Sequence, residues 1–265
     1  MPQLVICDID ATLVNEKKEL TPRTKEALIK LHEKGIYFGI ASGRPVDELK
    51  RNKERWDLPF DFDFVMGMNG AELWDGVHQK FYSYFMMKKE WLKETMEIMN
   101  VVECNPMVYW KGKIRCVRID DWMIHSASTS HKELEIVRLE DLYANENAKI
   151  MFRMKEEDMS KAEAWVKEHP NPYYHGFKTQ TTLLEFCDKR INKGYGLQKI
   201  CELNDMDLKD VMAFGDTSND NEMLKVAGCG VCMINGTDDT KACANAITTY
   251  DNDHDGLAKI GRAHV

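Results

Sequence analysis

The chain has 265 residues, of which 43% are hydrophobic and 30% are charged, a composition typical of globular proteins rather than of disordered or fibrous ones. Its formal net charge of −8 argues against a nucleic acid partner, because proteins bind a phosphate backbone mainly through an excess of Lys and Arg. No segment approaches the about 20 apolar residues of a membrane helix, and no basic leader precedes the first apolar run, so we expect a cytoplasmic protein that does not contact a membrane.

The N-terminal part of the chain alternates between apolar strands and an amphipathic helix. Residues 4–7, 36–41 and 64–68 are continuous apolar runs, as expected for strands buried on both faces. Thr21, which precedes a proline, predicts a helix start, and Gly35 predicts its end. This order predicts a parallel sheet in which the polar residues that follow the strands gather at one edge.

The middle of the chain follows a different pattern. Amphipathic helices are expected over residues 90–99 and 160–169, and strand-like segments occur without a regular alternation of strands and helices. Such a mixture indicates an α+β module. The strand-like segments cover residues 113–119, 149–154 and 183–186.

Strands and helices alternate again in the last part of the chain. The expected elements are helices over residues 192–203 and 219–227 and buried strands over residues 211–214 and 230–233. We therefore predict an α/β fold with a Rossmann-like parallel-sheet core, residues 1–84 and 189–265, that is interrupted by an inserted α+β domain, residues 85–188. The C-terminal segment GRAHV shows no periodicity and is set aside from this prediction.

Cys229 and Cys232 form a C-x-x-C pair. The pair could be a redox dithiol or half of a zinc site, but zinc would require a second pair at similar spacing, and the sequence has none. The surrounding run AGCGVCMIN is apolar and strand-like, which favours buried strand cysteines.

Two carboxylates directly follow the first predicted strand. Asp8 and Asp10 are expected at the sheet edge where open α/β sheets place ligands, and they can converge on a cation or divide nucleophilic and acid–base work. Alternatively, these residues could simply cap the next helix. Asp216 and Asp220 repeat the arrangement after the strand at residues 211–214, and four carboxylates without nearby His or Cys favour a hard cation such as Mg²⁺.

Phosphate-binding groups are expected at the same edge. Ser42 and Gly43 follow the second strand, where a hydroxyl and exposed backbone N–H groups can hold a phosphate, although Ser-Gly turns are common. Lys193 begins a helix, and its ammonium could neutralise both a phosphate and a carboxylate, although it could also be an ordinary surface lysine.

Together these segments resemble the four motifs of the haloacid dehalogenase-like phosphatases, in that family's order. The matches are DIDAT at residues 8–12, Ser42, Lys193 and GDTSND at residues 215–220. The insertion between the second and third motifs is similar to a class II cap domain. The segments ASGRP at residues 41–45, NGA at residues 69–71 and DGLAK at residues 255–259 are similar to the Cof-type sugar-phosphatase branch.

The resemblance implies a Mg²⁺-dependent phosphoric monoester hydrolase that acts on small phosphorylated metabolites, with sugar phosphates as the expected class. It implies that Asp8 attacks phosphorus, that Asp10 is the general acid and base, and that Thr12 holds the first motif. Ser42 and Lys193 would bind the transferring phosphoryl group.

The resemblance also implies the remaining site residues. Mg²⁺ would be bound by Asp8, the Asp10 carbonyl and Asp216, with Asp220 acting through water, and Asn219 would orient Lys193 or the phosphate. Further candidates for substrate contacts are Gly43, Arg44, Asn69, Glu185 and Arg190. A structural ion pair is an equal alternative for Arg44, and solvated polar residues at a domain junction are the alternative for Glu185 and Arg190.

One position departs from the family's pattern. The first motif usually has Gly where this chain has Ala11, and alanine tolerates fewer backbone conformations. Activity is expected to survive if the backbone there is ordinary. Three other functions remain open at this point: a phosphomutase of the same fold, a non-enzymatic phosphate or metal sensor, and a receiver domain, which would be shorter and lack the insertion.

Overall fold

The computed structural model describes residues 1–259, so the segment GRAHV lies outside the described residues. The chain forms two compact units, one from Met1–Tyr82 together with the chain from Asn192 onward, and one from Ser83–Ile191. We call them unit 1 and unit 2. Unit 2 begins slightly before, and ends slightly after, the inserted domain predicted from the sequence. None of the helices in residues 1–259 has both the length and the apolar character needed to span a bilayer.

Unit 1 contains an eight-stranded sheet with the order β14-β13-β12-β1-β2-β3-β4-β5. Neighbouring strands from β14 to β3 are parallel, and β4 pairs antiparallel with β3. The prediction of a parallel-sheet α/β core is therefore confirmed. The strands are β1 (Leu4–Asp8), β2 (Tyr37–Ala41), β3 (Phe64–Gly67), β4 (Glu72–Asp75), β5 (Lys80–Ser83), β12 (Val211–Gly215), β13 (Cys229–Cys232) and β14 (Ala246–Ile247).

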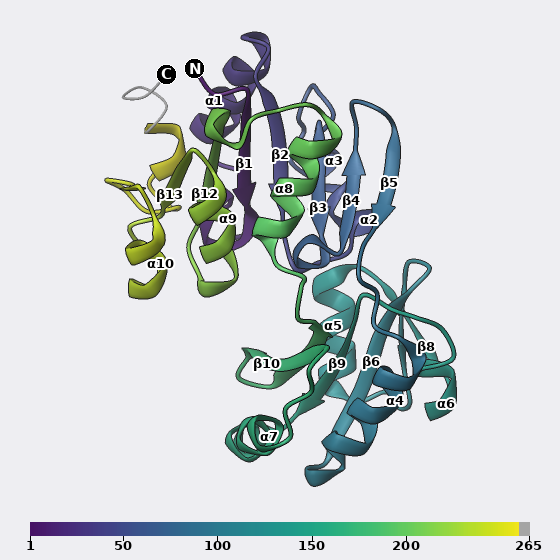
Figure 1. The fold of residues 1–265 in the computed structure, drawn as a ribbon. Coiled ribbons are helices and arrows are strands. Elements are labelled where there is room, and N and C mark those ends of the chain that lie inside the picture. Colours follow the sequence, from purple (N-terminus) through teal and green to yellow (C-terminus); the bar gives the residue numbers. More distant parts are fainter. Residues whose placement is uncertain (260–265) are drawn as a thin grey trace. The chain divides into compact units, whose positions relative to one another are not determined.

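Helices cover both faces of this sheet, with α8 and α9 in front and α1 behind in Figure 1. Helix α1 begins where predicted because the Thr21 side chain accepts a hydrogen bond from the backbone N–H of Thr24 and proline occupies the first turn. The Asn192 side chain caps α8 in the same way. The helices of unit 1 are α1 (Pro22–Glu33), α2 (Val46–Leu49), α3 (Asn52–Arg55), α8 (Lys193–Leu203), α9 (Asn221–Val226) and α10 (Asp238–Cys243).

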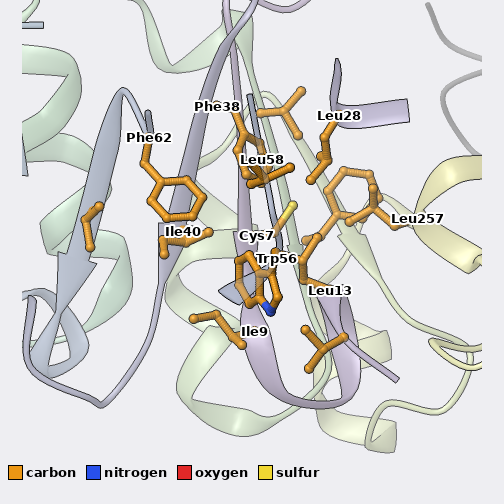
Figure 2. Packing of buried hydrophobic residues seen from close by; sticks show 14 of the residues in the cluster. Cys7, Ile9, Leu13, Leu28, Phe38, Ile40, Trp56, Leu58, Phe62 and Leu257 are labelled. Atoms are coloured by element: carbon orange, nitrogen blue, oxygen red, sulfur yellow. The ribbon is translucent and has the colours of Figure 1, made fainter. Parts of the chain in front are cut away.

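The apolar core on the α1 face fixes the central strands. Cys7, Phe38 and Ile40 point from β1 and β2 toward Leu28 of α1 and toward Leu257 near the C-terminus, as Figure 2 shows. All of these side chains are buried. Successive residues of β1 face this cluster and the helices on the opposite face in turn. If β1 shifted by one residue relative to its neighbours, apolar side chains would change faces and lose their packing. The C-terminal ends of the strands are therefore held at fixed positions.

Unit 2 contains a six-stranded sheet with the order β10-β11-β9-β6-β7-β8, in which only β7 and β8 pair in parallel. It carries an apolar cluster on each face, and the α+β prediction is confirmed. The strands are β6 (Cys104–Trp110), β7 (Lys113–Cys116), β8 (Glu133–Ile136), β9 (Lys149–Met154), β10 (Tyr174–Gln180) and β11 (Leu183–Asp188), and the helices are α4 (Lys89–Ile98), α5 (Asp121–Ser130), α6 (Leu139–Leu142) and α7 (Glu156–Glu168).

Candidate active site

The centre of the site is a buried lysine between two carboxylates. Lys193 Nζ donates to Asp8 Oδ1 at 2.5 Å and to Asp220 Oδ1 at 2.6 Å, and the lysine side chain is fully buried. Asp8 ends β1, and Asp220 ends the short 3₁₀ turn η5 (Ser218–Asp220) that follows β12. Since β1 and β12 are parallel neighbours, their ends lie at the same edge of the sheet, which brings together residues far apart in the sequence.

A third carboxylate completes this cluster. The Asp216 carboxylate accepts a hydrogen bond from Thr12 Oγ1 at 2.9 Å, so Thr12 links the first motif to the last. One oxygen from each of Asp8, Asp216 and Asp220 lies within 4.8 Å of the others, and all three residues are buried. The structure thus brings together five of the predicted residues, Asp8, Thr12, Lys193, Asp216 and Asp220, and places the Asp220 carboxylate in contact with Lys193.

The cluster holds more negative than positive charge, and its protonation equilibria reflect this. Burial raises the pKa of Asp8 well above its usual range, although Lys193 opposes the change. Burial and the neighbouring Asp220 raise the pKa of Asp216 to about 6. Burial disfavours the Lys193 ammonium, but Asp220 and Asp8 outweigh it and hold its pKa above the ordinary value. A cation would stabilise the ionised carboxylates here.

Asp10 lies beside the cluster in a different environment. Its Oδ2 accepts from Arg44 at 3.0 Å, and its Oδ1 lies 2.8 Å from Lys18 Nζ. Burial alone would raise the pKa of Asp10, but Arg44 and Lys18 outweigh it and hold that pKa below its usual value. Arg44 also pairs with Glu48 at 3.1 Å, so of its two expected roles the structure shows the ion pair.

The predicted phosphate-binding loops meet one another. The backbone N–H of Asn69 donates to the Ser42 carbonyl at 3.0 Å, and a Cβ added to Gly43 would lie 3.4 Å from the Asn69 side-chain oxygen. That oxygen also lies 3.4 Å from Asn219 Nδ2. The Asn219 side chain otherwise accepts from Thr217, whereas Lys193 is contacted by Asp8 and Asp220.

The two candidates in unit 2 are already engaged in ion pairs. Glu185, on β11, is 5% exposed and accepts from Lys149 Nζ at 2.8 Å. Arg190 makes a two-pronged contact with Asp188, at 2.9 Å from Nε and 2.7 Å from Nη2. A substrate that contacts Glu185 would therefore also meet Lys149, and one that contacts Arg190 would also meet Asp188.

The sequence did not identify Lys18, and it left the backbone conformation at Ala11 open. Lys18 stands at a left-handed position, with φ 63°, in the turn after the first motif, and an exposed lysine among several gave no signal. Ala11 has φ 58° and ψ 7°, so its backbone is not in the ordinary region. The Gly that the family usually has at this position was the available signal.

The C-x-x-C pair is unrelated to this site's chemistry. Cys229 and Cys232 lie on β13, and neither is in a disulfide. Burial raises the pKa of both thiols, to about 11 for Cys232. The prediction of buried strand cysteines is confirmed for Cys232, whereas Cys229 is only partly buried.

Comparison with known proteins now identifies the family. A family model described as haloacid dehalogenase-like hydrolase matches residues 5–260. The chain belongs to the haloacid dehalogenase-like hydrolases. A solved haloacid dehalogenase-like hydrolase from Bacteroides thetaiotaomicron is 25% identical and superposes with a TM-score of 0.89 over 100% of both chains. The structure of a sugar phosphatase of subclass IIB has the same fold, with 23% identity and a TM-score of 0.82 over 98% of both chains.

Curated relatives of this haloacid dehalogenase-like hydrolase are phosphatases. Two from Bacillus subtilis are named 5-amino-6-(5-phospho-D-ribitylamino)uracil phosphatase, and each is 26% identical. The matches cover 98% and 99% of this chain and 96% of each relative. The chain is thus a phosphatase, a phosphoric monoester hydrolase, and the resemblance seen in the sequence is confirmed.

Proposed function

We propose that this phosphatase hydrolyses small phosphorylated metabolites, sugar phosphates first among them, through a covalent acyl phosphate on Asp8. The observation that carries the proposal is the buried Asp8–Lys193–Asp220 contact at the end of β1, beside Asp216. The names of relatives add support, since they describe action on a phosphorylated ribitylaminouracil and on sugar phosphates.

In this proposal Asp8 is the nucleophile. A carboxylate oxygen of Asp8 forms a bond to phosphorus while the bond from phosphorus to the leaving oxygen breaks. Lys193, held at 2.5 Å from Asp8, is placed to neutralise the nucleophile and the transferring oxygens. Ser42 and the backbone N–H of Gly43 supply further donors at the adjacent strand end.

Asp10 is the proposed general acid and base. It gives a proton to the leaving oxygen in the first step and takes one from the water that hydrolyses the acyl phosphate in the second. Its contacts with Arg44 and Lys18 favour the ionised form, which suits the second step. To act as the acid in the first step, Asp10 must take up a proton, and Arg44 and Lys18 oppose this because they favour its ionised form.

The proposed cofactor is Mg²⁺, bound by the carboxylates of Asp8 and Asp216 and by the Asp10 carbonyl, with Asp220 acting through water because its oxygens already accept from Lys193 and from backbone N–H groups. The residues fit such an ion, because three buried carboxylates face a single buried lysine and all donors are oxygens. When bound, the metal neutralises charge that develops on the phosphoryl oxygens. Unit 2 is proposed as the cap domain that selects the leaving group, with Glu185 and Arg190 as its candidate contacts.

Substitution of Asp8 tests the covalent step. Asp8→Asn keeps the side-chain shape but cannot form the acyl phosphate, so turnover of p-nitrophenyl phosphate should fall by at least about 10⁴-fold while the thermal unfolding midpoint is retained. Acid quench during turnover of ³²P-labelled substrate should label only the wild type. Asp57→Asn, on the exposed surface, is the matched control and should keep full activity. Substantial turnover by Asp8→Asn would refute covalent catalysis at this residue.

A further inference from the structure

The segment Asn252–Asp255, which leads into the DGLAK motif, has no part in the proposed chemistry. We call it the C-terminal loop. In the structure it contacts the chain that follows the first motif: Asn252 Nδ2 donates to the Val14 carbonyl at 3.0 Å, and the Glu16 backbone N–H donates to Asp253 Oδ1 at 2.8 Å. Asp255 accepts from Thr21 Oγ1 at 2.5 Å. These contacts hold both ends of residues 14–21.

Residues 15–19 form a closed turn within that segment. The backbone N–H of Asn15 donates to the Glu19 carbonyl at 3.0 Å, and that of Lys18 donates to the Asn15 carbonyl at 2.9 Å. Lys18 occupies a left-handed position with φ 63°, and its ammonium lies 2.8 Å from Asp10 Oδ1. Since Arg44 holds the other oxygen at 3.0 Å, the two cations together fix the rotation of the Asp10 carboxylate.

Lys18 cannot hold this geometry alone. Its side chain is 62% exposed, and an exposed ion pair made by a long, flexible side chain contributes little and is easily lost to solvent. The C-terminal loop supplies the missing rigidity, because Asn252 is 9% exposed and the nearby Leu257 is packed in the core at 5% exposure. Val14, the residue that Asn252 contacts, is 1% exposed.

We propose that the C-terminal loop is a positioning element for catalysis: it fixes the turn at residues 15–19 so that Lys18 holds the Asp10 carboxylate in its working orientation. Asn252 and Asp253 are then positioning residues that act through Lys18. This inference rests on the proposed acid–base role of Asp10.

The dependence of turnover on the leaving group tests the proposal. Benzyl phosphate and p-nitrophenyl phosphate are similar in size, but benzyl alkoxide is much the stronger base and leaves only when it receives a proton. A displaced general acid therefore slows benzyl phosphate selectively. We expect Asp253→Ala and Lys18→Ala each to lower kcat for benzyl phosphate about tenfold, because the loss of orientation of the Asp10 carboxyl outweighs the easier protonation that follows loss of the Lys18 contact, while kcat for p-nitrophenyl phosphate changes less than about twofold.

Conservative and matched variants separate positioning from simple support of the fold. Asp253→Asn keeps the accepting oxygen and should restore wild-type behaviour. Asp251→Ala removes a carboxylate next to the C-terminal loop that accepts from His254, and it should leave kcat for both substrates unchanged. Because Asp253 acts through Lys18, the double variant should lose no more than Lys18→Ala alone. Equal losses on both substrates, or additive losses in the double variant, would overturn the proposal.

Asp10→Asn in the same assay distinguishes failure of this inference from failure of the proposed function. If Asp10→Asn does not discriminate between the two leaving groups, the acid–base assignment of Asp10 is wrong. If it discriminates but Asp253→Ala does not, the acid–base assignment stands and the C-terminal loop has no positioning role.

Discussion

Both units bury charged side chains, but they balance the charges differently. In unit 1, the carboxylates of Asp8 and Asp220 both contact the ammonium of Lys193, and a third buried carboxylate, that of Asp216, lies beside them. In unit 2, Lys149 and Glu185 are matched one to one at 2.8 Å, and both side chains are 6% exposed. A matched pair can offset much of its desolvation cost, whereas an excess of buried carboxylate raises pKa values and disfavours the folded state.

The difference lies in how completely the buried charges are paired. Burial of charge alone does not distinguish the two arrangements, because Lys149 and Glu185 are as buried as Asp8. The excess of buried carboxylate in unit 1 would be stabilised by a further cation, and it lies where parallel strands end. Breaking the balance in unit 2 should therefore cost stability, and changing the excess in unit 1 should alter metal binding.

The largest expected effect is on the balanced pair. Glu185→Ala removes the carboxylate that Lys149 Nζ contacts at 2.8 Å and leaves more positive than negative charge at this buried position, which should lower the free energy of unfolding by about 3–5 kcal/mol. The double variant Lys149→Met/Glu185→Leu should recover most of that loss. Arg190→Ala, which removes a side chain that is 58% exposed, should change stability by less than about 1 kcal/mol. Urea unfolding measures the free energy of unfolding of all three variants. A small effect of Glu185→Ala would show that the Lys149–Glu185 pair is not buried in solution.

The next effect concerns metal binding by the unbalanced cluster. Protons compete with Mg²⁺ for Asp216, whose pKa burial and Asp220 raise to about 6, and for Asp8, whose pKa burial also raises. Asp216 is mostly ionised above pH 6 and mostly protonated below it. Its protonation alone should therefore lower Mg²⁺ affinity up to about tenfold for each pH unit below about 6. Titration calorimetry measures this, and Asp216→Ala should raise the Mg²⁺ concentration for half-maximal activity about 100-fold. An unchanged requirement would place the metal elsewhere.

The smallest effect concerns backbone strain beside the same cluster. Ala11 has φ 58°, and its carbonyl accepts from Asn235 Nδ2 at 2.8 Å, so the strained conformation is held in place. Ala11→Gly should stabilise the protein by about 1 kcal/mol, because glycine adopts this conformation without a steric penalty. Ala27→Gly, in the middle of α1, should have the opposite sign and a similar size. Destabilisation by Ala11→Gly would show that the alanine methyl group contributes more than the strain costs.

The central strands were predictable because they are buried on both faces. Continuous apolar runs such as LVIC at residues 4–7 have few alternatives, and the polar residues after them mark the edge of the sheet. The strands β4, β5, β6, β8, β10 and β14 were not predicted. Strands β5, β8 and β10 have substantially exposed residues and lack a continuous apolar run, whereas β6 is largely buried but contains Asn105 and Pro106, which break its apolar run. The predicted helix at residues 219–227 is instead η5 followed by α9, which places Asp220 in the turn.

The motifs predicted which side chains of unit 1 lie together, but not which individual contacts they make. Contacts such as that of Asp220 with Lys193 depend on the geometry of a short turn, and the contact of Lys18 with Asp10 depends on a left-handed backbone angle. Neither is set by hydrophobic periodicity, which reports only the faces of helices and strands. The ion pairs of Glu185 and Arg190 were missed for the same reason.

The position of β1 at the centre of its sheet affects how the protein is made. Strand β1 pairs with β2 on one side and with β12 on the other, and β12 emerges from the ribosome only after the whole of unit 2. Until then one edge of the apolar segment LVICD has no partner, and unpaired apolar edges promote aggregation. Unit 2 is continuous in sequence and can complete its own sheet during this delay. The carboxylates of the proposed active site therefore come together late in synthesis, when β12 closes the sheet.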